Sequence, residues 1–223
     1  MLFRSIEILQ PYSKWLRDWV MPNSFKIFFF SPRHRRHISD GLPGKYKHLA
    51  EENFKYLVVP VDYNLFKPVS GITRRKDLFI FVGFIHPNKG INDILKIAER
   101  NPQSEYWLIG TLEEGPYKKE DFEKYHNVKY LGHKPQKELP KYYSEAVSCY
   151  LLPTGGAVES AGRTIIEAVL CGCCPMVNND VGIASYGWFR YPDLVKKYID
   201  KSNDLLFKCI YDGINETNTM NLI

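Results

Sequence analysis

The chain has 223 residues and a mass of 26.0 kDa, with 44% hydrophobic and 25% charged residues. This composition is typical of a globular protein and argues against extended disorder. The mean hydropathy is −0.32, and no apolar run approaches the ~18–20 residues needed to cross a bilayer, which excludes a transmembrane helix.

The net charge of +5 is unevenly distributed along the chain. Residues 1–76 hold 14 Lys and Arg against 6 Asp and Glu, whereas residues 77–223 hold 16 against 19. A basic segment joined to a mildly acidic domain predicts an anionic partner for that segment.

The N-terminus and the cysteines point to a cytoplasmic chain. Residues 1–7 lack the basic, apolar and small-residue regions of a signal peptide. Five cysteines, an odd number, argue against a disulfide framework or a zinc site. We expect them to be small buried hydrophobic residues.

The first 76 residues show a mixed pattern. Apolar residues over 6–20 predict an imperfect amphipathic helix, interrupted near Pro11. The pattern then predicts a strand over 26–30, a basic loop or helix start over 31–37, a strand over 56–60 and an extended linker over 60–68.

From residue 77 apolar strands alternate with amphipathic helices. The strands are expected over 78–82, 106–109, 128–131, 147–152 and 175–177, and the helices over 91–98, 139–146 and 164–170, with Gly172 ending the last helix. Repeated βα units predict a doubly wound parallel sheet of the Rossmann type, which binds ligands beyond the carboxyl ends of its strands. We therefore divide the chain into an N-terminal segment, 1–76, and a ligand-binding α/β domain, 77–223.

Two glutamates with seven residues between them stand out in the second part. Glu159 precedes a predicted helix, Glu167 lies inside it, and the small-residue turn Ser160–Gly162 separates them. The free N–H groups at such a helix start favour a phosphate, and the carboxylates can accept hydrogen bonds from sugar hydroxyls. The alternative is that Glu159 caps the helix and Glu167 is a solvated surface residue.

This segment resembles the E-x7-E signature of retaining glycosyltransferases of the GT-B fold, especially glycosyltransferase family 4. The similarity runs through about residues 56–190. It includes the stretches 58–66, 81–90 (similar to the family's G-R-x4-K-G), 128–132, 151–153 and 175–182. The resemblance implies transfer of a sugar from a nucleoside diphosphate sugar to an acceptor hydroxyl, with retention of configuration and without a metal or other cofactor.

The resemblance also implies roles for individual residues. Lys89 would contact the diphosphate, Glu159 the transferred sugar and Glu167 the ribose hydroxyls. Gly162, Arg163 and Thr164 would hold the phosphates at the helix start. Gly83, Gly155 and Gly156 would lie on the donor side, the last two leaving room for the sugar, and His133 within Gly132–Lys134 would lie beside the base.

One residue departs from the family pattern. Phe84 stands where the family has an arginine, and loss of such a cation can cost ~3 kcal/mol of leaving-group stabilisation. Arg163, at the start of the phosphate-binding helix, could supply the missing charge, or it could be an unrelated surface residue.

The N-terminal part is short for a GT-B enzyme, which normally has two Rossmann-like domains. Residues 26–62 resemble only the last strand–helix–strand elements of the first domain. The resemblance therefore implies either half of a split or truncated enzyme, or a minimal transferase whose acceptor supplies much of the recognition itself. Its basic and aromatic residues, including Trp15, Trp19 and Arg33–Arg36, could meet an anionic membrane surface that carries a lipid-linked acceptor, or could be ordinary solvated residues. A nucleic-acid role is disfavoured because the arginine cluster is short.

Two classes of function therefore remain. The first is a nucleotide-sugar-dependent glycosyltransferase acting on a glycan, a lipid-linked acceptor or a protein. The second is a non-catalytic sugar-nucleotide-binding or assembly protein, or one half of a split transferase that needs a partner subunit. Glu159, Glu167 and Lys89 favour the first class, and Phe84 together with the short N-terminal part favours the second.

Overall fold

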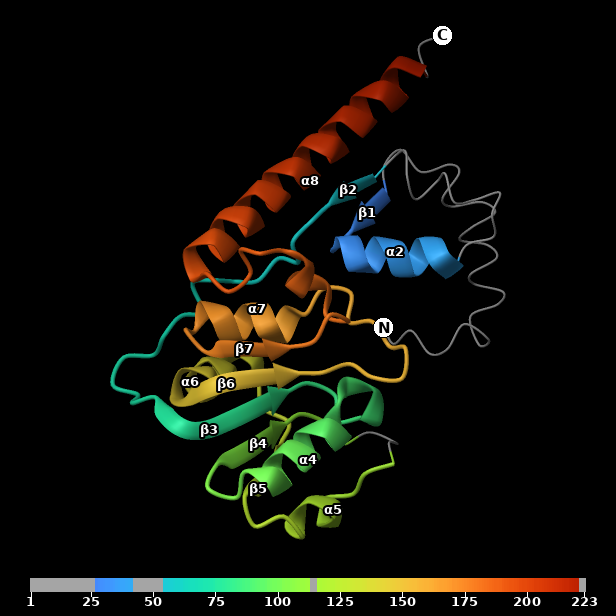
Figure 1. Ribbon diagram of the computed structural model, residues 1–223. Coiled ribbons are helices and arrows are strands. Elements are labelled where there is room, and N and C mark those ends of the chain that lie inside the picture. Colours follow the sequence, from blue (N-terminus) through green and yellow to red (C-terminus); the bar gives the residue numbers. More distant parts are fainter. Residues whose placement is uncertain (1–26, 42–53, 113–115, 221–223) are drawn as a thin grey trace.

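The computed structural model describes residues 27–41, 54–112 and 116–220 (Figure 1). The amphipathic helix expected over residues 6–20, with Trp15 and Trp19, lies outside these residues.

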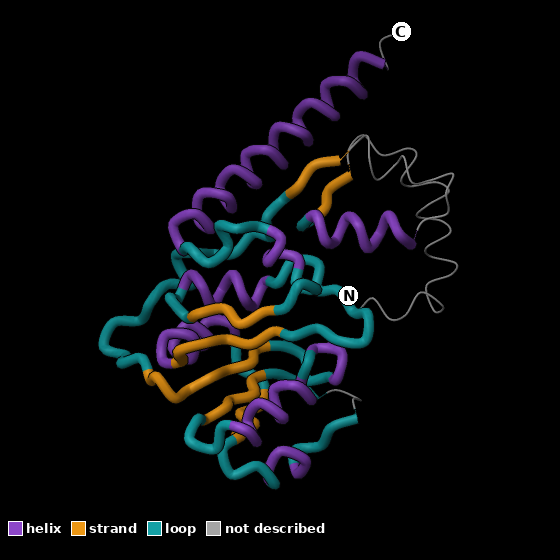
Figure 2. The backbone as a smooth tube through the Cα atoms, viewed as in Figure 1, coloured by secondary structure: helices purple, strands orange, loops and turns teal. Residues whose placement is uncertain are grey.

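Five strands form a parallel sheet in the order β5-β4-β3-β6-β7 (Figure 2). They span Arg75–Val82 (β3), Glu105–Ile109 (β4), Val128–Gly132 (β5), Ala146–Leu151 (β6) and Cys174–Val177 (β7). The central strand β3 is apolar over residues 78–82 and largely buried, because helices cover both faces of the sheet. The predicted doubly wound α/β fold is thus confirmed, with every expected strand of the domain found.

Four helices cover the sheet: α4 (Ile91–Arg100), α5 (Glu120–Glu123), α6 (Leu139–Glu145) and α7 (Arg163–Leu170). Helices α4 and α5 lie on one face and α6 and α7 on the other, as right-handed crossovers require (Figure 1). Helix α4 buries Ile91, Ile94, Leu95 and Ala98, the face its sequence periodicity predicts. Short 3-10 helices occur at Pro87–Lys89 (η3), Gln136–Glu138 (η4) and Gly182–Ser185 (η5).

Helix α7 ends as the sequence predicts. Gly172 has a φ of +76°, and its N–H donates to the Val169 carbonyl at 2.9 Å. The N–H of Cys173 donates to the Ala168 carbonyl at 2.9 Å. These two bonds form a Schellman motif, which turns the chain directly into β7.

The N-terminal segment adds a small separate unit. Strands β1 (Ile27–Phe29) and β2 (Phe54–Tyr56) pair in parallel, and α2 (Pro32–Gly41) lies beside them. This strand–helix–strand order matches the expectation for residues 26–62. The division of the chain at residues 76 and 77 stays a prediction; β3 itself begins at Arg75.

The strand expected over 56–60 is misplaced, because the observed strand ends at Tyr56. The N–H of Leu57 still donates to the Phe29 carbonyl, but the next N–H, of Val58, donates to Ser202 Oγ at 2.8 Å. The backbone therefore leaves the small sheet here and joins the long helix α8 (Pro192–Met220).

Helix α8 begins near α7 and runs past β2 to the C-terminus (Figure 1). Its first turns are anchored by buried Val195 and Ile199, and Tyr63 OH donates to Asp200 at 2.9 Å. Within the described ranges, no helix is both long and apolar enough to cross a membrane.

Four of the five cysteines are buried, and Cys174 is exposed. The expectation of burial is wrong for Cys174 because β7 lies at the edge of the sheet. Along this strand Cys174 and Met176 face solvent, while Pro175 between them faces the core.

Candidate donor-binding site

The predicted site residues gather where the chain leaves β3 and β6, at the carboxyl ends of the sheet. The segment after β3 carries Lys89 on η3, and the segment after β6 carries Glu159 and leads into α7. Two hydrogen bonds tie the segments together, from Thr154 N to the Asn88 carbonyl (3.1 Å) and from Thr154 Oγ1 to the Pro87 carbonyl (3.0 Å). The two sides of the site are therefore one connected structure.

Gly90 allows this close approach. Its φ of +82° lies in the left-handed region, and a Cβ at this position would lie 2.1 Å from the Leu152 carbonyl oxygen. Only glycine fits here, immediately after Lys89, without moving the backbone. His86 shapes the same turn, since its Nδ1 accepts a hydrogen bond from Asn88 N at 3.2 Å.

Lys89 and Glu159 form an ion pair across this connection. Lys89 Nζ lies 2.5 Å from Glu159 Oε2, and about a quarter of each side chain is exposed. Two of the three residues expected to be catalytic are thus in direct contact, although 70 positions separate them in the sequence. A partly exposed pair of this kind can open when an anion enters the site.

The backbone of Glu159 is fixed by a short parallel bridge to Val181. Its N–H donates to the Asp180 carbonyl at 2.9 Å, and its carbonyl accepts from Gly182 N at 2.7 Å. Glu159 is therefore held by the segment after β7 and does not cap α7. That part of the alternative interpretation is wrong.

Helix α7 begins directly after Gly162, which has a φ of +70°. A Cβ at Gly162 would lie 2.8 Å from Val181 Cγ1 and 3.0 Å from Ile183 Cγ2, so a side chain here would press against both neighbours. Among the described residues no side chain caps the helix, so the first-turn N–H groups of Arg163 and Thr164 have no side-chain acceptor there. Such a helix start is suited to bind a phosphate.

Glu167 is buried in the domain, with only 3% of its surface exposed. Tyr143 OH on α6 donates to its Oε2 at 3.2 Å, and Arg163 Nε lies 3.7 Å from its Oε1. Burial raises the pKa of Glu167 to about 7, against the smaller opposing effects of Tyr143, Arg163 and Gln136. The alternative of a solvated surface residue is wrong, because α6 covers this side of α7.

The remaining residues expected to bind the donor are glycines in the loops after β3 and β6 and His133 after β5. Gly155 and Gly156 have φ angles of +65° and +78°, and a Cβ at either would meet open space, so their backbone conformation and not crowding favours glycine. Gly83 ends β3, where its carbonyl closely approaches Gly110 after β4. His133 is exposed after β5, which lies two strand positions from β3, a backbone separation of about 10 Å.

Several residues that position the site were not predicted from the sequence. Thr154 joins the two segments, Tyr143 meets Glu167, and Asn178 donates from Nδ2 to the Pro153 carbonyl at 2.8 Å. Phe84 stacks on His86 with ring centroids 5.6 Å apart. Thr154 carried a signal because it lies directly beside the Gly155–Gly156 pair, and Phe84 and Asn178 lie in stretches that carry the family resemblance. Tyr143 carried none.

A family model described as glycosyl transferases, group 1, matches residues 62–186. The chain belongs to this family. The matched range includes β3 to η5 and thus the whole site described above. A comparison with curated protein sequences finds no significant match.

Solved structures with the same fold are glycosyltransferases of the GT-B type. Sucrose-phosphate synthase from Thermosynechococcus elongatus is 17% identical, with a TM-score of 0.71 over 96% of this chain and 63% of that chain. AviGT4, a glycosyltransferase involved in avilamycin A biosynthesis, is 17% identical, with a TM-score of 0.58 over 78% of this chain and 53% of that chain. Anabaena HepE, solved with UDP and glucose, is 15% identical, with a TM-score of 0.57 over 87% and 58%.

These identities establish the fold alone. The group 1 chain spans between about half and two thirds of the length of these three proteins.

Proposed function

We propose that this chain transfers a sugar from a nucleoside diphosphate sugar to an acceptor hydroxyl. The observation that carries this proposal is the Lys89–Glu159 ion pair beside the uncapped start of α7. It brings a cation, a carboxylate and free backbone N–H groups together, which are the groups that a diphosphate joined to a sugar requires.

In the reaction, the bond between the sugar's anomeric carbon and the diphosphate oxygen breaks, and its electron pair stays on the diphosphate. Lys89 and the N–H groups of Arg163 and Thr164 offset that charge. The acceptor oxygen bonds to the anomeric carbon, and its proton passes to the departing diphosphate. Glu159 holds the sugar by accepting hydrogen bonds from its hydroxyls, and Glu167 accepts those of the ribose.

The finer features are also part of the proposal. Retention of configuration and a place in glycosyltransferase family 4 are supported by the spacing of Glu159 and Glu167. The base would lie near His133, and Gly83, Gly155 and Gly156 would leave room for the donor. Cations and N–H groups at the diphosphate support catalysis without a metal ion, at a cytoplasmic location where nucleotide sugars are available.

Arg163 is proposed to compensate for Phe84. Its side chain is 57% exposed at the first position of α7, and its Nε lies 3.7 Å from Glu167 Oε1 one turn further along the helix. Turning toward a diphosphate would break only this long contact among the described residues. Arg163→Ala should weaken nucleotide diphosphate binding and slow turnover; unchanged values for both would contradict the compensation.

A second candidate function is a binding or assembly role without turnover, alone or as half of a split transferase. Phe84 in place of a cation favours it. In that case the donor would bind, but a partner subunit would have to complete the acceptor side.

Donor hydrolysis with UDP-, GDP- and ADP-sugars separates the two functions. The variants are Lys89→Gln, Glu159→Gln and Glu167→Gln, with Glu99→Gln on the exposed side of α4 as the matched control. We expect turnover with one donor class in the wild type and in the control, and a loss of at least about 100-fold in Lys89→Gln. Nucleotide binding without turnover supports the second function, and no nucleotide binding contradicts both.

A further inference from the structure

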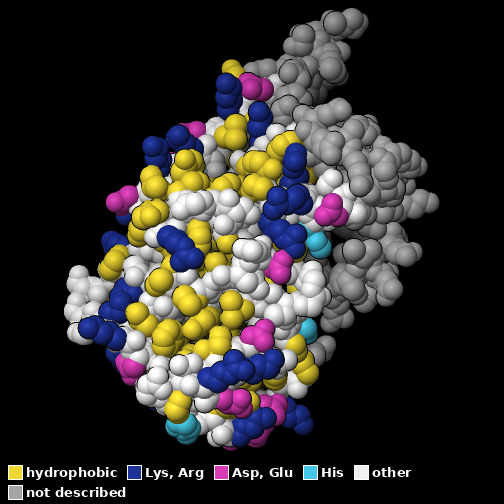
Figure 3. Space-filling view, viewed as in Figure 1, with side chains coloured by type: hydrophobic (Ala, Val, Ile, Leu, Met, Phe, Trp, Pro, Cys, Tyr) yellow, Lys and Arg dark blue, Asp and Glu magenta, His cyan; other side chains and the backbone are white. Residues whose placement is uncertain are grey.

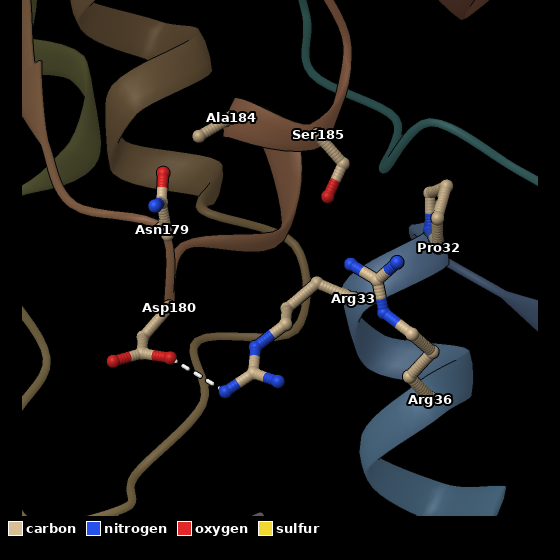
Figure 4. Close-up of a pocket in the computed structure, with 7 residues that line it drawn as sticks. All are labelled: Pro32, Arg33, Arg36, Asn179, Asp180, Ala184 and Ser185. Atoms are coloured by element: carbon tan, nitrogen blue, oxygen red, sulfur yellow. Dashed lines mark hydrogen bonds and ion pairs between the residues drawn. The ribbon is translucent and has the colours of Figure 1, made fainter.

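A pocket of about 420 Å³ lies between α2 and the segment that follows β7 (Figure 4). Pro32, Arg33 and Arg36 line it from α2, and Asn179, Asp180, Ala184 and Ser185 line it from the other side. The N-terminal segment and the α/β domain thus build this pocket together, and neither makes it alone.

The charged groups in this pocket are two arginines and one carboxylate. Arg33 Nη2 lies 2.6 Å from Asp180 Oδ1, which balances one positive charge. Arg36 is exposed and makes no ion pair with any described residue. Figure 4 shows both arginine side chains extending from α2 toward the 179–185 segment. The net charge of the lining is therefore positive.

Arg33 also keeps an unused hydrogen-bond donor. Its Nε is buried and finds no acceptor among the described residues. A buried donor without an acceptor costs free energy, and an oxyanion in the adjoining pocket would supply one after a small rotation of the guanidinium group. Asn179 and Ser185 add neutral polar groups on the opposite side.

The pocket adjoins the segment that carries Glu159. The Asp180 carbonyl accepts the Glu159 N–H at 2.9 Å, and Ser31 Oγ donates to the Ser160 carbonyl at 3.0 Å. Gly182 is fitted between them, since a Cβ there would lie 1.9 Å from the Ser160 oxygen and 2.4 Å from Ser31 Oγ. A group bound in the pocket is thus held against the same backbone that positions Glu159.

We propose that this pocket binds an anionic group of the acceptor, a phosphate or a carboxylate, through Arg33 and Arg36. Guanidinium groups bind such oxyanions through two parallel hydrogen bonds, with a defined orientation. The assignment of the ligand as acceptor rests on the proposed function, because it depends on Glu159 holding the transferred sugar. The proposal makes Arg36 a specificity-determining residue outside the E-x7-E segment.

The arginines of α2 are less suited to bind a membrane surface than an anion in this pocket. In the space-filling view, Lys and Arg side chains gather beside the start of α2 (Figure 3). However, Arg33 is held by Asp180, and the Arg35 guanidinium lies 4.4 Å from the centre of the Phe54 ring. Two of the three arginines of α2 thus contact other residues of the protein and do not extend toward a membrane.

The test uses the full chain and glycerol 1-phosphate, with glycerol as the neutral counterpart, measured by isothermal titration calorimetry. Each titration is repeated with UDP, GDP or ADP at saturation. We expect glycerol 1-phosphate to bind with and without nucleotide, and glycerol not to bind. Arg36→Gln should weaken binding about tenfold or more, the value of one charge-assisted contact. Arg100→Gln, on the exposed end of α4, is the matched control and should bind like the wild type.

Three results would overturn the proposal. They are no binding by the wild type, equal binding by Arg36→Gln, or displacement of glycerol 1-phosphate by nucleotide, which would place it at the donor phosphates. Binding of phosphatidylglycerol vesicles, but not of glycerol 1-phosphate, with a loss in Arg36→Gln would instead identify a membrane contact. Failure of every nucleotide to bind contradicts the proposed function separately, and the titrations without nucleotide still decide whether the pocket binds anions.

Discussion

Glu167 is a carboxyl group that folding removes from water, and this should make the stability of the protein depend on pH. Burial raises its pKa from 4.5 to about 7, while the unfolded chain keeps the ordinary value. Between these two pH values the folded protein retains a proton that the unfolded protein releases. The free energy of unfolding should therefore fall as pH rises from about 4.5 to about 7.

The size of this effect follows from the two pKa values. Each pH unit of difference corresponds to about 1.4 kcal/mol, so the ionised Glu167 side chain destabilises the folded state by about 3 kcal/mol above pH 7. Glu167→Gln removes the ionisation but keeps an oxygen that can accept from Tyr143 OH. Relative to the wild type, the variant should gain about 3 kcal/mol in stability between pH 4.5 and pH 8.

Urea unfolding at pH 4.5, 6 and 8 measures this difference. The exposed Glu99→Gln is the control, and its stability should follow that of the wild type at every pH. If wild type and Glu167→Gln lose or gain stability in parallel across this range, the carboxyl group is not desolvated in the folded protein. Burial would then not raise the pKa of Glu167.

The same group should couple protons to nucleotide binding. Ribose hydroxyls donate hydrogen bonds, so they favour the ionised carboxylate of Glu167 and lower its pKa. Nucleotide affinity of the wild type should then rise with pH and level off above about 7, with protons released on binding. Calorimetry in buffers of different ionisation enthalpy detects this release, and Glu167→Gln should show none. An unchanged release in the variant would place the ribose elsewhere.

Three further substitutions test how the fold supports the site. Gly90→Ala should cost more than the about 1–2 kcal/mol of a left-handed backbone, because its Cβ would lie 2.1 Å from the Leu152 oxygen, and it should also weaken nucleotide binding. Asn127→Leu should cost roughly 2–3 kcal/mol, since its buried Nδ2 donates to the carbonyl of Ala98 in α4 and to those of Asn101 and Ser104 before β4. Ser202→Ala should cost about 1–2 kcal/mol, because the buried Val58 N–H loses its acceptor. Urea unfolding measures all three losses.

Matched variants define what would contradict these expectations. Gly71 has the same φ of +82° but open space around it, so Gly71→Ala should show only the conformational cost. Equal losses for Gly71→Ala and Gly90→Ala would contradict the close approach to Leu152. Ser70→Ala, at an exposed serine, should change stability little. If Asn127→Leu or Ser202→Ala lost no more stability than Ser70→Ala, the result would contradict the buried hydrogen bonds of Asn127 and Ser202.

The sheet could be predicted because its strands are buried on both faces and therefore read as continuous apolar runs. Residues 78–82 show this directly, and Gly83 marks where the run ends. The strand expected over 56–60 was misplaced because an apolar run does not by itself identify a strand. An apolar run also suits a segment that crosses from one sheet to a helix, as Val58 does when it bonds to Ser202.

The site residues were predicted by type, but their contacts were not. The burial of Glu167 depends on α6 packing over α7, whose residues 165–170 are all buried, and no local pattern marks a glutamate in such a helix as buried. The pairing of Arg33 with Asp180 joins positions 147 apart. Contacts at that separation arise from the order of the strands and not from any pattern within a segment.

Under the proposed function, the Lys89–Glu159 pair lets one small site bind both a diphosphate and a neutral sugar. In the closed pair each charge satisfies the other, which limits the cost of holding both partly out of water. A diphosphate offers Lys89 a stronger partner, and the α7 start adds N–H groups that Glu159 cannot use, because its backbone is fixed by the Val181 bridge. When Lys89 contacts the phosphate, the Glu159 carboxylate would be free to accept hydrogen bonds from the sugar hydroxyls. Under the proposed function, binding of the diphosphate would thereby free the group that orients the sugar, while Lys89 and the α7 N–H groups offset part of the diphosphate charge.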